Sequence, residues 1–290
     1  MKTLSKILII GTGLIGASIG LAAKRAGVAD CVVGVGRRQT NLDAAIERGA
    51  VDYTFCDLAD AIRHDTTNNT TNTDELIIVC TPVGSIVEQV RNAASLVKQP
   101  TLITDAGSTK SAICEQLADT LPNSCRFVGS HPIAGSERGG AAAGLTDLFD
   151  NRTTIITPSA NSFAADVSLL ENFWQALGSR TVIMNPQSHD RVLSRTSHLP
   201  HLLAATLTNL LTPHEREFVG TGFLDMTRIA SGSPTMWHDI VAANAEMILD
   251  ACSSIVTNIE QLKSYIEAAD YENVTKLLER AKTVRDELGR

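Results

Sequence analysis

The chain of 290 residues is long enough for two domains, each with its own hydrophobic core. Its composition, with 43% hydrophobic and 20% charged residues, is that of a soluble globular protein. A formal net charge of −7 argues against a nucleic-acid-binding protein, which would normally carry a basic face. The six cysteines are scattered without a CxxC pair, so we expect free thiols in a reducing compartment and a cytoplasmic location.

The uncharged segment 7–23 follows two lysines and superficially fits a secretory signal. No other segment has the length of a membrane span, and we expect no membrane partner. Glycines interrupt this segment in a G-x-G-x-x-G pattern that follows a predicted strand at 6–10 and opens a predicted helix at 14–27. A second strand is expected at 31–35, which is the context that makes this pattern a dinucleotide-binding loop rather than a plain turn. The predicted cofactor-binding residues of the loop are Gly11, Gly13, Leu14, Ile15 and Gly16.

Strands and helices alternate through the following part of the chain. A helix is predicted at 39–48, and the polar tract 64–74 is interpreted as a solvated loop. Further strands, separated by helical stretches, are predicted at residues 75–82, 101–108, 125–132, 153–158 and 180–186. This βαβα order favours an α/β fold with a Rossmann-type, doubly wound parallel sheet, which the last two strands extend. We therefore predict a Rossmann domain at 1–186 and an all-helical domain at 187–290.

Polar residues follow several of these strands at the edge where doubly wound sheets bind ligands. Thr81 and Pro82 are expected at the cofactor, and the segment 105–110, which contains Ser108, is expected around the same crevice. His131 ends a strand at this edge and is a candidate general base, with Ser108 near enough in the topology to orient its imidazole. The alternative is a histidine that only bonds a turn.

The helical half contains a second group of polar residues. His198 and His201 lie three residues apart, and His189 lies nine residues upstream. We expect no metal site, because no acid or cysteine occupies ligand spacing and the pair is not separated by four residues. Arg228 suits bidentate binding of a carboxylate, although it could equally form a structural pair with Asp225.

Taken together, the motifs resemble the prephenate/arogenate dehydrogenases of tyrosine biosynthesis. The segments that carry the resemblance are GTGLIGAS at 11–18, DAGSTK at 105–110, GSHPIAGSE at 129–137, SHLPH at 197–201, GFLDMTRIA at 222–230 and SPTMWHDI at 233–240. This resemblance implies a Rossmann domain, a helical dimerisation domain, an active site in the cleft between them and a homodimer.

The resemblance also implies roles for individual residues. His131 matches the catalytic histidine, Ser108 the serine that orients it, and Arg228 the substrate-binding arginine. The remaining substrate-site positions are His201, His198 and His189 in the pocket, Ser136 and Glu137 at the side-chain end, and Asp225 and Trp237 in a gating network, with Trp237 reaching across the dimer.

The implied reaction is the oxidative decarboxylation of prephenate to 4-hydroxyphenylpyruvate, with arogenate as the alternative substrate. The SHLPH form of the pocket favours prephenate. A β-hydroxyacid dehydrogenase or imine reductase would need a catalytic lysine or its equivalent on the helical half. A non-catalytic dinucleotide sensor would have no reason to combine His131 with Arg228.

The end of the second strand predicts which dinucleotide is bound. NAD-dependent enzymes place an acid about 20 residues past the glycine loop, where it accepts hydrogen bonds from the ribose 2′-hydroxyl. Gly36 occupies that position here and is followed by Arg37 and Arg38. Both arginines suit the 2′-phosphate of NADP. The alternative is that they form a solvated helix start, but helix N-termini disfavour cations. We therefore predict NADP as the cofactor, with NAD possible.

Overall fold

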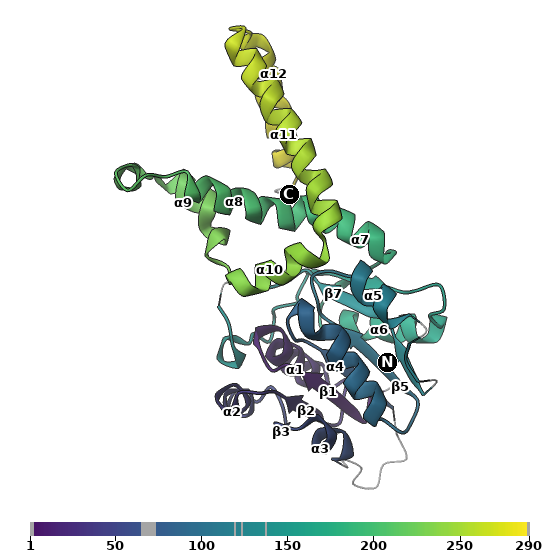
Figure 1. Ribbon diagram of the computed structural model, residues 1–290. Coiled ribbons are helices and arrows are strands. Elements are labelled where there is room, and N and C mark those ends of the chain that lie inside the picture. Colours follow the sequence, from purple (N-terminus) through teal and green to yellow (C-terminus); the bar gives the residue numbers. More distant parts are fainter. Residues whose placement is uncertain (1–2, 65–73, 119, 123, 137, 289–290) are drawn as a thin grey trace. The chain divides into compact units, whose positions relative to one another are not determined.

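The computed structural model describes residues 3–64, 74–118, 120–122, 124–136 and 138–288 (Figure 1). Most of the predicted polar loop at 64–74 lies outside these residues. A six-stranded parallel sheet has the order β3-β2-β1-β4-β5-β6, which is the strand order of the dinucleotide-binding doubly wound fold. Its strands are β1 Lys6–Ile10, β2 Val32–Val35, β3 Tyr53–Phe55, β4 Glu75–Val79, β5 Thr101–Asp105 and β6 Cys125–Phe127.

Both faces of this sheet are buried, as a doubly wound sheet requires. In β1, Ile7 and Ile9 belong to one core cluster, while Leu8 and Ile10 belong to the other. Because side chains alternate along a strand, the two clusters lie on opposite faces. The helices of this part are α1 Leu14–Ala26, α2 Gln39–Glu47, α3 Leu58–Arg63, α4 Val83–Leu96, α5 Ser111–Leu117 and α6 Ala164–Ala176, with a short 3-10 helix η1 at Ala141–Ala143. The signal-like segment 7–23 thus forms β1 and α1 of the core.

A second, three-stranded sheet has the order β7-β8-β9, with β7 Gly129–Pro132, β8 Thr153–Thr157 and β9 Arg180–Ile183. The expectation that residues 153–158 and 180–186 extend the large sheet was therefore wrong, as was a single strand at 125–132. β6 pairs with β5 up to Phe127, whereas β7 pairs antiparallel with β8. The physical reason lies at Ser130, whose N–H donates to the Asp105 carboxylate (3.1 Å) instead of continuing the β5 ladder.

After β9, every regular element that the structure describes is helical, as predicted. These elements are α7 Pro186–Leu193, the π-helical turn η2 Ser194–His198, α8 Leu199–Asn209, η3 Glu215–Phe218, α9 Thr221–Thr227, η4 Arg228–Ser231, α10 Pro234–Ala243, α11 Ala245–Glu267 and α12 Tyr271–Leu288. Among the described residues, no single helix combines the length and hydropathy of a membrane span; α10 and α11 meet that test only when joined across their break.

The chain forms two compact units, Met1–Asn244 and Ala245–Arg290. In the first unit, α10 packs against α4 and α7 against α5, so these helices belong with the sheet. In the second unit, α11 and α12 pack on each other, and Asp270 caps α12 by accepting the N–H of Asn273 (3.1 Å). The predicted domain boundary at 186/187 falls inside the first unit and remains a prediction.

All six cysteines are free thiols, as expected, and Cys31, Cys114 and Cys125 are buried. Burial raises the pKa of both the Cys31 and the Cys114 thiol to about 11. These side chains therefore stay protonated and pack as small apolar groups.

Candidate active site

The glycine loop between β1 and α1 has the geometry that a bound pyrophosphate requires. Gly11 has a φ of +102°, and a Cβ there would stand 2.8 Å from the Cys80 carbonyl oxygen. A Cβ on Gly16 would lie 2.2 Å from the Gly11 oxygen, so this glycine lets α1 pack directly on the loop. At Gly13, by contrast, a Cβ would meet nothing within 4 Å, which leaves open space in front of the helix N-terminus.

A cavity of about 550 Å³ opens at this loop and continues along the end of β2. Six of the predicted cofactor-binding residues line it, namely Gly11, Gly13, Arg37, Arg38, Thr81 and Pro82. Leu14 and Ile15 form the first turn of α1, where they are partly buried against the core, and Gly16 is buried beneath them. The buried hydroxyl oxygen of Thr81 has no hydrogen-bond partner among the described residues, which leaves it for a ligand. These residues fit a dinucleotide.

Beyond the end of β5, a group of buried charges fixes the segment that follows. Lys110 and Asp105 form an ion pair with both side chains fully buried. Asp105 also accepts the N–H groups of Gly107 (2.9 Å) and Ser130. The carboxylate of Asp190, from α7, accepts the main-chain N–H groups of Lys110 and Ser111, each at 2.8 Å. Both carboxylates are therefore satisfied by several donors, as buried charges must be.

The predicted base, His131, is the end of a hydrogen-bonded chain of three side chains. Its Nδ1 lies 2.8 Å from Nε2 of His189, and Nδ1 of His189 lies 2.8 Å from the Asp190 carboxylate. Because a carboxylate only accepts, His189 carries its proton on Nδ1 and accepts at Nε2. His131 must then donate from Nδ1, which leaves the Nε2 lone pair of His131 available to a substrate proton.

Burial keeps this pair of imidazoles neutral. Desolvation lowers the pKa of His131 well below its ordinary value, and the charge of nearby Lys110 lowers it further. The pKa of His189 is also lowered by desolvation, although its hydrogen bond to Asp190 opposes that effect. The hydrogen bonds from His189 and the Ser111 main chain outweigh desolvation at Asp190 and lower the pKa of that carboxyl. At neutral pH, a neutral His131 therefore faces a chain that ends in a carboxylate.

His189 was predicted to line the substrate pocket, and the structure corrects this. The side chain is fully buried, and both ring nitrogens are engaged by His131 and Asp190. The same contact gives His131 Nδ1 a partner other than Ser108, whose predicted orienting role therefore remains a prediction. Asp190 was missed because it occupied no motif. Its only signal was its place beside His189.

The other two predicted pocket histidines lie on the next helical turns. The Nδ2 group of Asn244 lies 3.1 Å from His198 Nδ1, while the buried Nε2 of His198 has no hydrogen-bond partner in the described structure. Burial lowers the pKa of His198 to about 4. His201 stacks on Trp237 with ring centroids 3.6 Å apart and an interplanar angle of 12°.

This stacking lies within one chain, and the expectation that Trp237 reaches across a dimer remains a prediction. Gly232 explains the local packing, because a Cβ there would lie 2.8 Å from Trp237 Nε1 and 2.9 Å from His201 Cε1. The glycine lets the link between η4 and α10 close over the two stacked rings.

The remaining predicted substrate residues are exposed. Arg228 begins η4, which packs against the helix that carries His201, and Asp225 lies on α9. Ser136 is exposed and its hydroxyl accepts the N–H of Arg138 (3.0 Å). Glu137 lies outside the described residues. The structure thus brings His131, His189 and Asp190 together, while the substrate-binding roles of the exposed residues remain predictions.

A doubly wound sheet with a glycine loop, a dinucleotide cavity and a neutral buried imidazole beyond the strand ends defines an NAD(P)-dependent dehydrogenase. Residues 19–183 match the model for the nucleotide-binding domain of prephenate dehydrogenase, and residues 185–280 match that for its dimerization domain. The chain therefore belongs to the prephenate dehydrogenase family.

Individual relatives agree with this assignment. The prephenate dehydrogenase of Bacillus subtilis (strain 168) is 36% identical over 289 residues, which cover 97% of this chain and 76% of the relative. The cyclohexadienyl dehydrogenase of Zymomonas mobilis is 31% identical, with 93% and 91% covered. The crystal structure of prephenate dehydrogenase from A. aeolicus in complex with hydroxyphenyl propionate and NAD+ superposes with a TM-score of 0.90 at 28% identity, covering 99% of both chains.

Proposed function

We propose that the protein catalyses the oxidative decarboxylation of prephenate to 4-hydroxyphenylpyruvate, a step of tyrosine biosynthesis, with NADP as the hydride acceptor. The observation that carries this proposal is the His131–His189–Asp190 chain, which leaves Nε2 of His131 unprotonated. This atom lies beyond the ends of the strands, and the ends of neighbouring strands line the dinucleotide cavity. Similarity to prephenate dehydrogenases supports the choice of substrate.

In this reaction His131 accepts the proton of the substrate's C4 hydroxyl at Nε2. The bound nicotinamide supplies the acceptor for the hydride that leaves C4, and loss of CO₂ from the ring makes it aromatic. The proton on His131 is costly in a buried site beside Lys110, so it returns readily to the phenolate oxygen of the product. Asp190 stabilises the transient positive charge through His189, which lies between the two groups.

Arg228 is the proposed partner of a substrate carboxylate. A guanidinium offers two parallel N–H donors to a carboxylate, which fixes orientation as well as charge. Its position on η4, packed against α8, associates it with His201. Ser136, Asp225 and Trp237 are proposed to border the same substrate.

The preference for NADP rests on the end of β2. Gly36, Arg37 and Arg38 all line the dinucleotide cavity, and no carboxylate occupies the Gly36 position. Both arginine side chains are exposed and can therefore turn toward a 2′-phosphate. NAD+ is the dinucleotide in the A. aeolicus complex, and the two cofactors are therefore compared directly in the assay below.

A homodimer is proposed from the helical half. Along α11, the apolar residues Leu249, Val256, Ile259 and Ile266 are each more than half exposed and recur at helical spacing. Such a stripe suits pairing with a second copy about a two-fold axis, and this part of the chain matches the family's dimerization domain. Sedimentation at micromolar concentration should give a dimer, and a stable 31.0 kDa monomer would contradict it.

The experiment that tests the proposed function is a two-by-two assay. The absorbance of reduced nicotinamide is followed with prephenate or arogenate as substrate and with NADP or NAD as cofactor. We expect the highest kcat/KM with prephenate and NADP. A higher kcat/KM with arogenate would show that arogenate is the substrate, and a higher kcat/KM with NAD would show that NAD is the cofactor. The absence of turnover with either substrate would refute the proposed function.

A further inference from the structure

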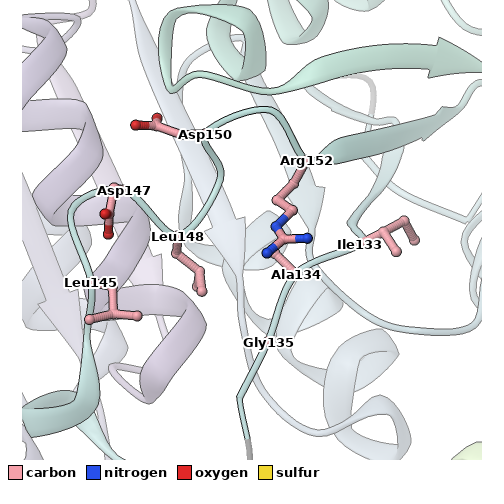
Figure 2. A pocket seen from close by; sticks show the side chains of 8 residues that line it. All are labelled: Ile133, Ala134, Gly135, Leu145, Asp147, Leu148, Asp150 and Arg152. Carbon is pink, nitrogen blue, oxygen red and sulfur yellow. The ribbon is translucent and has the colours of Figure 1, made fainter. Parts of the chain in front are cut away.

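A second cavity, of about 430 Å³, lies away from the glycine loop (Figure 2). Its volume is in the range of small-molecule sites. None of the predicted catalytic, substrate-binding or cofactor-binding residues lines it. The lining residues are Ile133, Ala134, Gly135, Leu145, Asp147, Leu148, Asp150 and Arg152.

Two of the charged groups near this cavity already satisfy each other. Arg25 of α1 makes a bidentate pair with Asp150, at 2.6 Å and 3.1 Å. The hydrogen bond to Arg25 lowers the pKa of the Asp150 carboxyl. This pair is therefore neutral as a unit and adds little net charge to the cavity.

The other two charged groups have no such hydrogen-bonded partner, although Asp147 lies near enough to Arg25 that its charge, after the larger effect of Asp150, helps to raise the pKa of that arginine. No other described residue makes a hydrogen bond or ion pair with the side chain of Arg152 or of Asp147. Figure 2 shows the Arg152 guanidinium on one side of the cavity and Asp147 on the other, with Leu148 between them. The cavity thus presents one cation and one anion on opposite walls.

Apolar side chains also line the cavity, with Leu145 and Leu148 on the Asp147 side of Arg152 and Ile133 on its other side (Figure 2). Ile133 and Leu145 are 38% and 44% exposed, and Leu148 is buried. A ligand with an apolar part would cover these surfaces and gain from their burial.

The backbone holds Arg152 in place. Asn151 has a positive φ of 59°, its N–H donates to the Gly178 oxygen (2.9 Å), and its own carbonyl accepts from Arg180 (3.2 Å). A Cβ on Gly178 would stand 2.2 Å from Asp150 Oδ1, so the two turns fit closely. A non-glycine residue in this conformation persists where its surroundings fix it, so the turn is preorganised.

We propose that this cavity binds an α-amino acid with an apolar side chain. Arg152 receives the carboxylate as a fork, Asp147 receives the ammonium group, and Ile133, Leu145 and Leu148 receive the side chain. A dianion would be repelled by Asp147, and a simple cation by Arg152, whereas a zwitterion complements both. The site lies beside β7 and β8, because β8 begins immediately after Arg152 and its Ile155 pairs with His131 of β7.

The test is calorimetric titration of the full chain with L-phenylalanine and L-leucine, which both carry the required groups. Saturable binding with a Kd of about 1 mM or tighter is expected. Two analogues each lack one charge: 3-phenylpropionate has no ammonium group and phenethylamine has no carboxylate. Each should bind at least about tenfold more weakly than L-phenylalanine, because one charge-assisted contact is lost.

Variants locate the binding. Arg152→Gln and Asp147→Asn should each weaken L-phenylalanine binding by about tenfold or more, while Arg138→Gln, an exposed arginine outside the lining, should not. His131→Asn should leave binding unchanged, which distinguishes this cavity from the active site. The proposal fails if neither amino acid binds at up to about 10 mM. It also fails if binding survives both cavity variants or disappears in His131→Asn.

Discussion

The dinucleotide cavity and the hydrogen-bonded chain of His131, His189 and Asp190, here called the imidazole chain, both belong to the candidate active site. They are built in different ways. The cavity is made by short contiguous segments, the 11–16 loop and the β2 end, which act through main-chain shape and small residues. The imidazole chain consists of buried side chains, and the hydrogen bond between its two histidines joins residues 58 positions apart. Its geometry depends on how α7 packs against the sheet.

This difference predicts how each part tolerates change. A site made by backbone keeps its shape when exposed side chains are replaced, so variants there should alter selectivity more than rate. A chain of buried hydrogen bonds loses a proton acceptor when one member is removed, so variants there should alter rate more than binding.

The largest effect is expected at the head of the imidazole chain. His131→Asn removes the proton acceptor and should lower kcat at least about a hundredfold with little change in KM. Steady-state kinetics with prephenate measure this. His238→Asn is the matched control, because that histidine is 80% exposed on α10 and should be silent. Near-normal kcat in His131→Asn would remove His131 from the mechanism.

A large effect on binding is expected at Arg228. Arg228→Ala removes a proposed carboxylate partner, and a lost charge-assisted hydrogen bond should raise KM for prephenate about tenfold to a hundredfold. Arg216→Ala, at another exposed arginine on η3, serves as the control. Should KM stay at the wild-type value in a folded Arg228→Ala protein, the arginine has a structural role instead.

Two substitutions of His189, the middle member of the imidazole chain, distinguish its effect on the tautomer of His131 from a role in packing. His189→Leu removes the acceptor for His131 Nδ1 and should lower kcat about tenfold or more, with KM nearly unchanged. His189→Gln can offer its amide oxygen in place of Nε2 and should recover much of that loss. Equal losses in both variants, in proportion to lost thermal stability, would indicate a purely structural histidine.

A smaller effect is expected in the cofactor cavity. Gly36→Asp with Arg37→Ala should move the NADP to NAD ratio of kcat/KM toward NAD by about fivefold, since an exposed charge pair contributes about 1 kcal/mol. The aspartate has little room, because a Cβ at Gly36 lies 3.1 Å from both Leu42 Cδ2 and Thr12 Oγ1. Arg37→Ala alone controls for that crowding. A wild-type preference for NAD would show that the arginines are only surface residues.

The mildest test is the pH profile. The pKa of His131 is lowered, so the base is unprotonated at and above pH 6.5, and kcat/KM should be flat there and fall only at lower pH. Buried histidines also destabilise the folded protein as pH falls below 6.5, with His198 contributing down to about pH 4. Circular dichroism at each pH separates unfolding from the loss of the base. An acid limb centred at or above pH 6.5 would show that His131 is not desolvated in the working enzyme.

Much of the fold was present in the sequence as local pattern. The strands at 6–10 and 31–35, the glycine loop and the helical second half appear in the structure within a residue or two of their predicted positions. These features depend on side-chain periodicity and on glycine, both of which act over a few neighbouring residues. His131 could be placed at a strand end for the same reason.

What the sequence alone determined was therefore a doubly wound fold with a dinucleotide loop and a histidine at the sheet edge. Only the tertiary structure decided that 125–132 divides between two sheets, that His189 links His131 to Asp190, and that Trp237 stacks on His201 in its own chain. It alone brought Arg152 and Asp147 to opposite walls of one cavity. The physical reason is that periodicity encodes which way a side chain faces its own element. A hydrogen bond between distant residues exists only once packing has brought their elements together and excluded water from between them.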